Sequence, residues 1–159
     1  EAYKYYMDAI KRDGVPYELI EKALPTIEGE VNDILSQMVD FNILLEMDGK
    51  NINTYLTYDD DNIWPLELSS GMERFISSLA IRVGLINVCN LPRPNFLAID
   101  EGFGNMDSDN LNSVYMLFQY LKSQFQFCFI VSHIESMRDT VDSLLEIRKD
   151  KGFSQINFN

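Results

Sequence analysis

The stretch "FLAIDEGFGNMDSDN", residues 96–110, places an apolar run directly before two adjacent acids. An apolar run without alternation is typical of a strand buried in a parallel sheet. Asp100 and Glu101 stand where that strand would end, and Gly102 and Gly104 follow them. The residues leave two interpretations open: an acidic turn that closes a buried strand, or carboxylates that hold a metal ion and a water.

The segments around this stretch predict an α/β fold. We expect helices over residues 3–12, 17–24, 26–41, 70–90, 108–124 and 134–141. We expect strands over residues 41–47, 51–58, 93–100 and 125–133, a loop over 59–65, and a closing hairpin over 143–158. Turn residues support the two hairpins, because Asp48-Gly49 and Lys151-Gly152 stand between the paired strands. From residue 70 onward helices alternate with strands, which is typical of an α/β sheet.

Composition restricts the class of protein. The 159 residues carry a formal net charge of -12, so the chain as a whole is not a basic surface for nucleic acid. The apolar runs, such as "FCFIVS", are too short to span a membrane, and the polar opening "EAYKYYMDAIKRD" is not a signal peptide, so we expect a protein of the cytoplasm or nucleus. Cys89 and Cys128 are far apart in the sequence, which excludes a zinc ribbon, and we expect both to be buried as small apolar residues.

The helix predicted from residue 70 has a distinctive start. Ser70 and Glu73 fit the capping-box pattern S-x-x-E, and Gly71 occupies the first helical position, where a better helix former would serve a purely structural helix. One interpretation is only a well-capped helix with an apolar core face. The other is a helix N-terminus that a phosphate can approach, because the exposed N–H groups and the helix dipole favour an anion there.

Two strand ends carry the other candidate residues. An apolar strand ending in Asp-Glu is the Walker B pattern, in which Asp100 would hold Mg²⁺ and Glu101 would orient and deprotonate a water. His133, the only histidine, follows the second apolar strand, which is also predicted to be buried. If the two strands are parallel, His133 lies at the same end as the acids, where a γ-phosphate contact would be needed. The alternatives are an acidic turn and an ordinary surface or core histidine.

In this order and spacing, the three motifs resemble the C-terminal half of ABC-type ATPase heads of the SMC/SbcC class. The resemblance covers residues 66–150 by motif, and residues 1–56 are similar to the segment in which SbcC-like chains leave a long coiled coil. It implies a C-terminal lobe with a mostly parallel sheet flanked by helices, preceded by a helical segment and a β-hairpin. It also implies a division into residues 1–65, the coiled-coil exit and hairpin, and residues 66–159, the lobe itself.

The resemblance also implies roles for individual residues. "SSGMERF" is similar to the family's signature motif, so Ser70 and Gly71 would reach the γ-phosphate of ATP bound to the opposite head. Glu73 matches the acid or amide of that motif and is counted with them as nucleotide-binding. Met72 replaces a second glycine of that motif, and Ser69 replaces a leucine. "FLAIDE" implies Asp100 for Mg²⁺ and Glu101 as general base.

Two further positions match family motifs. "GFGNMD" resembles the D-loop, with Asp107 as its acid, and His133 matches the switch histidine. No GxxxxGK[ST] and no Q-loop occur in the 159 residues, so the chain cannot form a complete nucleotide site. We therefore expect the C-terminal lobe of a split head.

The function implied is an ATPase that works only with the N-terminal lobe that carries the P-loop, using ATP and Mg²⁺. Expected partners are that lobe, a second head joined through ATP, an Mre/SbcD-type nuclease subunit and DNA, without a membrane. The implied process is DNA double-strand-break repair and recombination. Two alternatives stay open: a cohesin- or condensin-like SMC head, and a degenerate module that only docks a partner.

Overall fold

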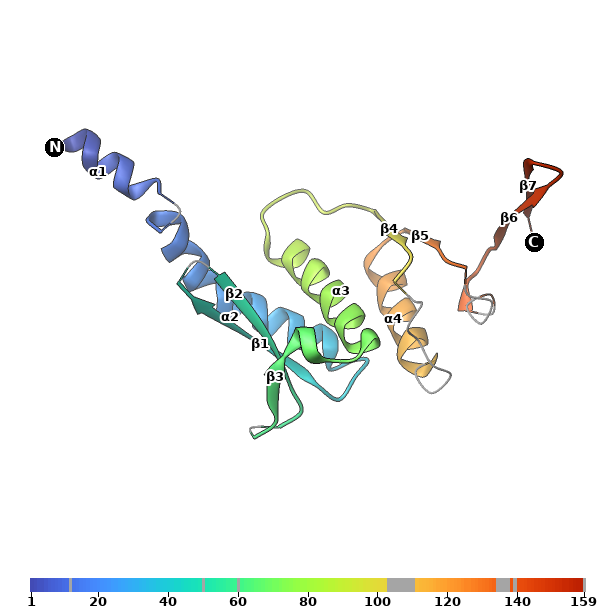
Figure 1. The fold of residues 1–159 in the computed structure, drawn as a ribbon, viewed down its shortest axis with the longest axis horizontal. Coiled ribbons are helices and arrows are strands. Elements are labelled where there is room, and N and C mark those ends of the chain that lie inside the picture. The colour runs from blue at the N-terminus through green and yellow to red at the C-terminus, as the bar shows by residue number, and fades with distance from the viewer. Residues whose placement is uncertain are drawn as a thin grey trace.

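The computed structural model describes residues 1–11, 13–49, 51–59, 61–102, 111–133, 138 and 140–158. It confirms an α/β chain (Figure 1). The elements in order are α1 (Ala2–Ala9), α2 (Val15–Leu35), β1 (Asn42–Asp48), β2 (Asn51–Thr57), β3 (Ile63–Pro65), a 3₁₀ turn η1 (Leu66–Leu68), α3 (Gly71–Val88), β4 (Phe96–Asp100), α4 (Leu111–Gln124), β5 (Phe127–Val131), β6 (Leu145–Asp150) and β7 (Phe153–Phe158). Most of the predicted helix over 134–141 lies outside the described residues.

The two helices predicted around Pro25 are a single helix, α2, of 21 residues. An internal proline removes one helical hydrogen bond and costs about 3 kcal/mol. The second half of α2 compensates by burying Val31, Ile34 and Leu35 in the core. The first half, together with α1, extends away from the body as an arm at the N-terminal end of the molecule (Figure 1).

The strands form three small sheets. β1, β2 and β3 pair antiparallel in that order, β4 pairs parallel with β5, and β6 pairs antiparallel with β7. The segment expected to be a loop thus contains β3, a short strand that pairs with β2. Parallel pairing in the described residues is confined to β4 and β5, so the parallel sheet is small.

Side chains of α2 cover the outer edge of β1. The Asn32 side chain forms two hydrogen bonds with Ile43: its Nδ2 donates to the Ile43 carbonyl at 2.9 Å, and its Oδ1 accepts from the Ile43 N–H at 2.8 Å. The Leu45 N–H donates to Glu28 Oε2 at 2.7 Å. Strand edges left open are templates for unwanted pairing, so these bonds both protect the edge and fix the hairpin against α2.

One core joins α2, the β1–β2 hairpin, α3, β4 and α4. Its central side chains come from the apolar face of each element; the most deeply buried are Val31, Leu35, Ile43, Leu56, Ile76, Val83, Val114, Leu117 and Leu121. The core therefore runs across residue 65, where the sequence suggested a boundary, and the two-part division remains a prediction.

The strands β4 and β5 are covered on one face only. Leu97, Ile99 and Ile130 pack against the core, while the other face exposes large apolar side chains: Phe96 at 58%, Phe127 at 60%, Phe129 at 48% and Val131 at 43%. The prediction that both strands are buried throughout is therefore wrong for this face, because nothing in the described part of the chain covers it. We call these four residues the open sheet face.

The two cysteines are less buried than the sequence predicts. Cys89 is exposed rather than buried, because it ends α3 where the chain leaves the core, and Cys128 is half-buried. Among the described residues, no helix combines the length and the apolar character that crossing a membrane requires.

Helices α2 and α3 approach closely at Gly84. A Cβ atom added there would lie 2.7 Å from Cγ2 of Val31, which is fully buried and stiff because it is β-branched. We expect Gly84→Ala to reduce the free energy of unfolding by about 1–3 kcal/mol through overpacking, measured by urea denaturation. Gly29→Ala is the matched control, since a Cβ at this helical glycine meets nothing within 4 Å. Equal effects of the two substitutions would contradict the close approach.

Candidate functional site

The parallel pairing of β4 with β5 brings the predicted catalytic residues to one edge. In the register of the pair, Asp100 lies opposite Val131, so the residues that follow each strand emerge side by side. His133 Nδ1 lies 3.5 Å from Glu101 Oε1. The expectation that His133 and the two acids share one end of a parallel pair is thereby confirmed as geometry.

Glu101 adopts an unusual backbone conformation. Its φ is 59°, in the left-handed region that non-glycine residues seldom occupy, and Gly102 follows with φ of 104°. The Glu101 N–H donates to the Val131 carbonyl at 2.9 Å, which extends the ladder by one bond beyond the strand and holds the turn. The side chain is 65% exposed, so the carboxylate faces solvent beyond the end of β4. Strained residues of this kind are concentrated at functional sites.

Helix α3 supports the turn from behind. A Cβ atom added at Gly102 would overlap Cε2 of Phe75, on the second turn of α3. Glycine is therefore required at position 102 for two reasons. The backbone has a positive φ, and Phe75 fills the space that a Cβ would need. This contact fixes the distance between the start of α3 and the end of β4.

The start of α3 forms the predicted capping box. Ser70 Oγ accepts from the Glu73 N–H at 3.2 Å, and Glu73 Oε2 accepts from the Ser70 N–H at 2.6 Å. Ser70 is exposed and Gly71 half-buried, whereas the Met72 side chain is buried in the core. Met72 therefore leaves the outer surface of the helix start open, although it replaces the glycine of the family motif.

Tyr58, which the sequence did not single out, completes this cluster. Its Oη donates to Glu73 Oε1 at 2.5 Å, and burial together with this bond raises the pKa of Tyr58 to about 12. Burial alone would raise the pKa of Glu73, but the hydrogen bonds from Tyr58 and Ser70 outweigh it and lower that pKa. Because Tyr58 is 15 positions before Glu73 and belongs to no motif, only the fold brings the two together.

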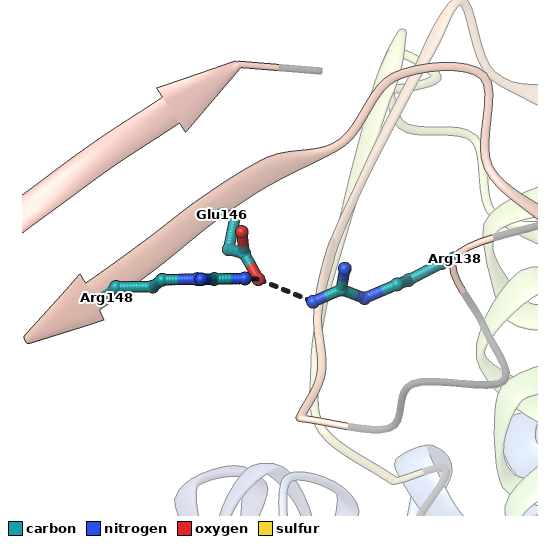
Figure 2. A network of polar contacts seen from close by, with 3 residues as sticks. All are labelled: Arg138, Glu146 and Arg148. Carbon is teal, nitrogen blue, oxygen red and sulfur yellow. Dashed lines mark hydrogen bonds and ion pairs between the residues drawn. The ribbon is translucent and has the colours of Figure 1, made fainter.

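A charged cluster links Arg138 to the β6–β7 hairpin. Glu146 Oε1 on β6 accepts from Arg138 Nη2 at 2.5 Å and from Arg148 Nη2 at 3.0 Å, and Figure 2 shows the carboxylate between the two guanidinium groups. The hydrogen bonds from Arg148 and Arg138 lower the pKa of Glu146. This cluster ties the hairpin β6–β7 to residue 138, five positions after His133.

Asp100 is the residue predicted to hold Mg²⁺ at this edge, and among the described residues no group of three or more His, Cys, Asp or Glu side chains could hold a metal ion. A single exposed carboxylate fits Mg²⁺, which keeps several waters and takes its other ligands from substrate phosphates. Asp107, the predicted D-loop acid, lies outside the described residues.

No family model matches the sequence. The uncharacterized protein R555 of Acanthamoeba polyphaga mimivirus is similar to this chain at 38% identity over 170 residues, covering 97% of this chain and 13% of that protein. The SbcC subunit of the nuclease SbcCD from Staphylococcus aureus (strain JH9) is 31% identical over 93 residues, covering 56% of this chain and 9% of that protein. The chain therefore spans a small part of the length of both relatives.

Among solved structures, a chain from a study of ATP-driven dimerization and DNA-stimulated activation of SMC ATPases is similar in fold. It superposes with a TM-score of 0.71 over 89% of this chain and 88% of that chain, at 13% identity. At this identity the superposition shows a common fold.

The space between Gly102 and Phe75 can be tested separately from the backbone conformation. We expect Gly102→Ala to lower the free energy of unfolding by about 2–4 kcal/mol, since it combines left-handed strain with overpacking. Gly152→Ala is the matched control, because Gly152 also has positive φ (89°) but an added Cβ there meets nothing within 4 Å. Urea denaturation should show a smaller loss of unfolding free energy for Gly152→Ala than for Gly102→Ala. The difference is the cost of the clash between the added Cβ at position 102 and Phe75. If the two losses are equal, Phe75 does not support the turn.

Proposed function

We propose that this chain, which has the fold of an SMC-type ATPase head lobe, is the C-terminal half of an ATP-hydrolysing head of the SbcC kind. The observation that carries the proposal is the edge of the β4–β5 pair. There an exposed Asp100, a strained Glu101 and His133 come together, with 3.5 Å between Glu101 and His133.

The residues at this edge suit the cleavage of a terminal phosphate. Glu101 accepts a proton from an attacking water and orients it, a contribution of about 10²- to 10⁴-fold in rate. His133 contacts the γ-phosphate from the adjacent strand end, and Asp100 would take part in holding Mg²⁺. The metal ion would neutralise charge that develops on the phosphate oxygens. Because the Glu101 N–H bonds to the Val131 carbonyl, the backbone that carries this carboxylate is already fixed when the water is oriented.

The start of α3 has a separate role in this proposal. Ser70 and Gly71 meet the γ-phosphate held by a second head, so that ATP joins the two heads, and Glu73 stabilises the helix start. The exposed Ser70 and the inward-facing Met72 support this role, since they leave the helix start accessible to a neighbouring molecule. Asp107 is proposed to contact the second head through the D-loop.

The rest of the nucleotide site is proposed to come from an N-terminal lobe with the P-loop. The open sheet face supports this partner, because its apolar side chains belong to the same two strands that carry the site. Three of the four come from β5. An apolar surface of this kind on a sheet is ordinarily covered by another layer. The arm of α1 and α2 also exposes Tyr3, Tyr6 and Leu19, as expected where it pairs with a second coiled-coil strand.

We further propose that the complete protein acts in DNA double-strand-break repair and recombination, inside the cell, with a nuclease subunit and DNA as partners. The similarity to the SbcC subunit of SbcCD supports this process over the cohesin- or condensin-like alternative, because SMC heads share the fold at lower identity. The net charge of -12 suggests that DNA contacts lie mainly on other parts of the protein. A docking module without catalysis is the alternative that the next two experiments test.

Replacing the proposed base should separate hydrolysis from ATP binding. In the head completed by its P-loop lobe, we expect Glu101→Gln to reduce turnover by at least about 10²-fold while ATP-dependent dimers persist. The measurements are phosphate release and sedimentation with ATP. Glu46→Gln, the same change at an exposed position on β1, is the control and should retain full turnover. Wild-type hydrolysis by Glu101→Gln would remove this residue from the role.

Blocking the helix start should prevent the heads from closing. We expect Ser70→Arg to abolish ATP-induced dimers, because it places bulk at the point where the second head's phosphate enters, while ATP binding to each head is retained. Sedimentation with and without ATP measures the dimer. Ser123→Arg, at an exposed serine near the end of α4, should dimerise normally. Normal dimers of Ser70→Arg would refute the proposed contact.

A further inference from the structure

Tyr58 is connected to the proposed phosphate-binding helix start through a single carboxylate. The two oxygens of Glu73 have different donors: Oε1 accepts from the Tyr58 hydroxyl at 2.5 Å and Oε2 from the Ser70 N–H at 2.6 Å. The Glu73 N–H in turn donates to Ser70 Oγ at 3.2 Å. Glu73 therefore bridges the segment after β2 and the residue that begins α3.

The Tyr58 ring is fixed although 46% of the residue is exposed. Its ring centroid lies 5.8 Å from that of Phe41 in an edge arrangement and 5.7 Å from that of Trp64 on β3. Phe41 is buried in the core and Trp64 packs against it. The Tyr58 ring is thus already held in place, and little side-chain conformational freedom is lost when its hydroxyl binds Glu73.

This arrangement has a consequence for Ser70. Since Ser70 Oγ already accepts the Glu73 N–H, its own O–H is left to donate, and the Ser70 backbone is held by Glu73 Oε2. A carboxylate bound at one oxygen only could rotate away from the helix start. Bound at both, it holds Ser70 in one conformation before any phosphate arrives, which reduces the ordering cost of binding.

We propose that Tyr58 is a positioning residue for the phosphate-binding helix start: through Glu73 it holds Ser70 in the orientation that meets the nucleotide of a second head. The inference rests on the proposed function, since it concerns the same contact between heads. Tyr58 itself touches no substrate. It strengthens the closure of two heads without contributing to the binding of ATP by either one.

The test uses the complete protein with Glu101→Gln as background, so that ATP-bound dimers accumulate. Tyr58→Phe removes one hydroxyl and keeps the ring contacts with Phe41 and Trp64. We expect it to raise the protein concentration for half-maximal ATP-induced dimerisation about tenfold, the order expected when one more side chain on each head must be ordered as the heads close. The affinity of each head for a fluorescent ATP analogue should be unchanged. Tyr55→Phe, on β2 of the same hairpin, is the control and should behave as the background protein.

A second measurement separates positioning from a general loss of stability. If Tyr58 acts through Glu73, the double variant Tyr58→Phe/Glu73→Ala should dimerise no more weakly than Glu73→Ala alone, because alanine leaves the Tyr58 hydroxyl no acceptor at position 73. In the hydrolysing protein, the low turnover of Tyr58→Phe should recover when the head concentration is raised, which a merely less stable fold would not do. An unchanged dimerisation midpoint in Tyr58→Phe, or fully additive effects in the double variant, would overturn the inference.

The Ser70→Arg variant distinguishes this inference from the proposed function. If Ser70→Arg blocks ATP-induced dimers while Tyr58→Phe dimerises as the background protein does, the role of Tyr58 is refuted and the proposed function stands. If Ser70→Arg forms normal dimers, the contact between heads is itself refuted, and the role of Tyr58 is refuted with it.

Discussion

The site depends on the parallel hydrogen-bonded pair of β4 and β5. Their register places Asp100 opposite Val131, and one further bond, from the Glu101 N–H to the Val131 carbonyl, continues the pairing into the turn. Without this pair Asp100 and His133, 33 positions apart in the sequence, would have no reason to meet. Helix α3 fixes the same turn from the other side through the contact between Phe75 and Gly102. The two restraints together hold Glu101, whose carboxylate is exposed, in a backbone conformation that a glutamate would not adopt alone.

Periodicity and turn residues predicted most elements well. The start of α3 follows from the pattern Ser70 to Glu73, and both hairpins follow from their Gly-containing turns, because these features act over a few residues. Two expectations failed where distant contacts decide the outcome. Pro25 does not interrupt α2, because the helical residues that follow it pack into the core and keep the helix continuous. Ile63–Pro65 form a strand only because β2 offers an edge to pair with.

The site shows the same division between local and distant information. Asp100, Glu101 and His133 could be selected from the sequence because each lies at or just beyond the end of an apolar strand. Tyr58 could not be selected, since its partner is Glu73 on another element and no spacing relates the two. Likewise, the open sheet face looked like buried strand in the sequence. Hydrophobicity indicates that a residue needs a cover, but it does not indicate whether the cover belongs to the same part of the chain.

The left-handed conformation of Glu101 bears on how this protein would respond to selection in the laboratory. Glycine or asparagine fits such a conformation with less strain than glutamate, so either should make the folded state more stable. A library screened only for heat resistance would therefore enrich these replacements at position 101 and lose the carboxylate. At position 101 the preference of the backbone and the proposed chemistry of the side chain therefore oppose each other, as they do where strain is stored at a functional site.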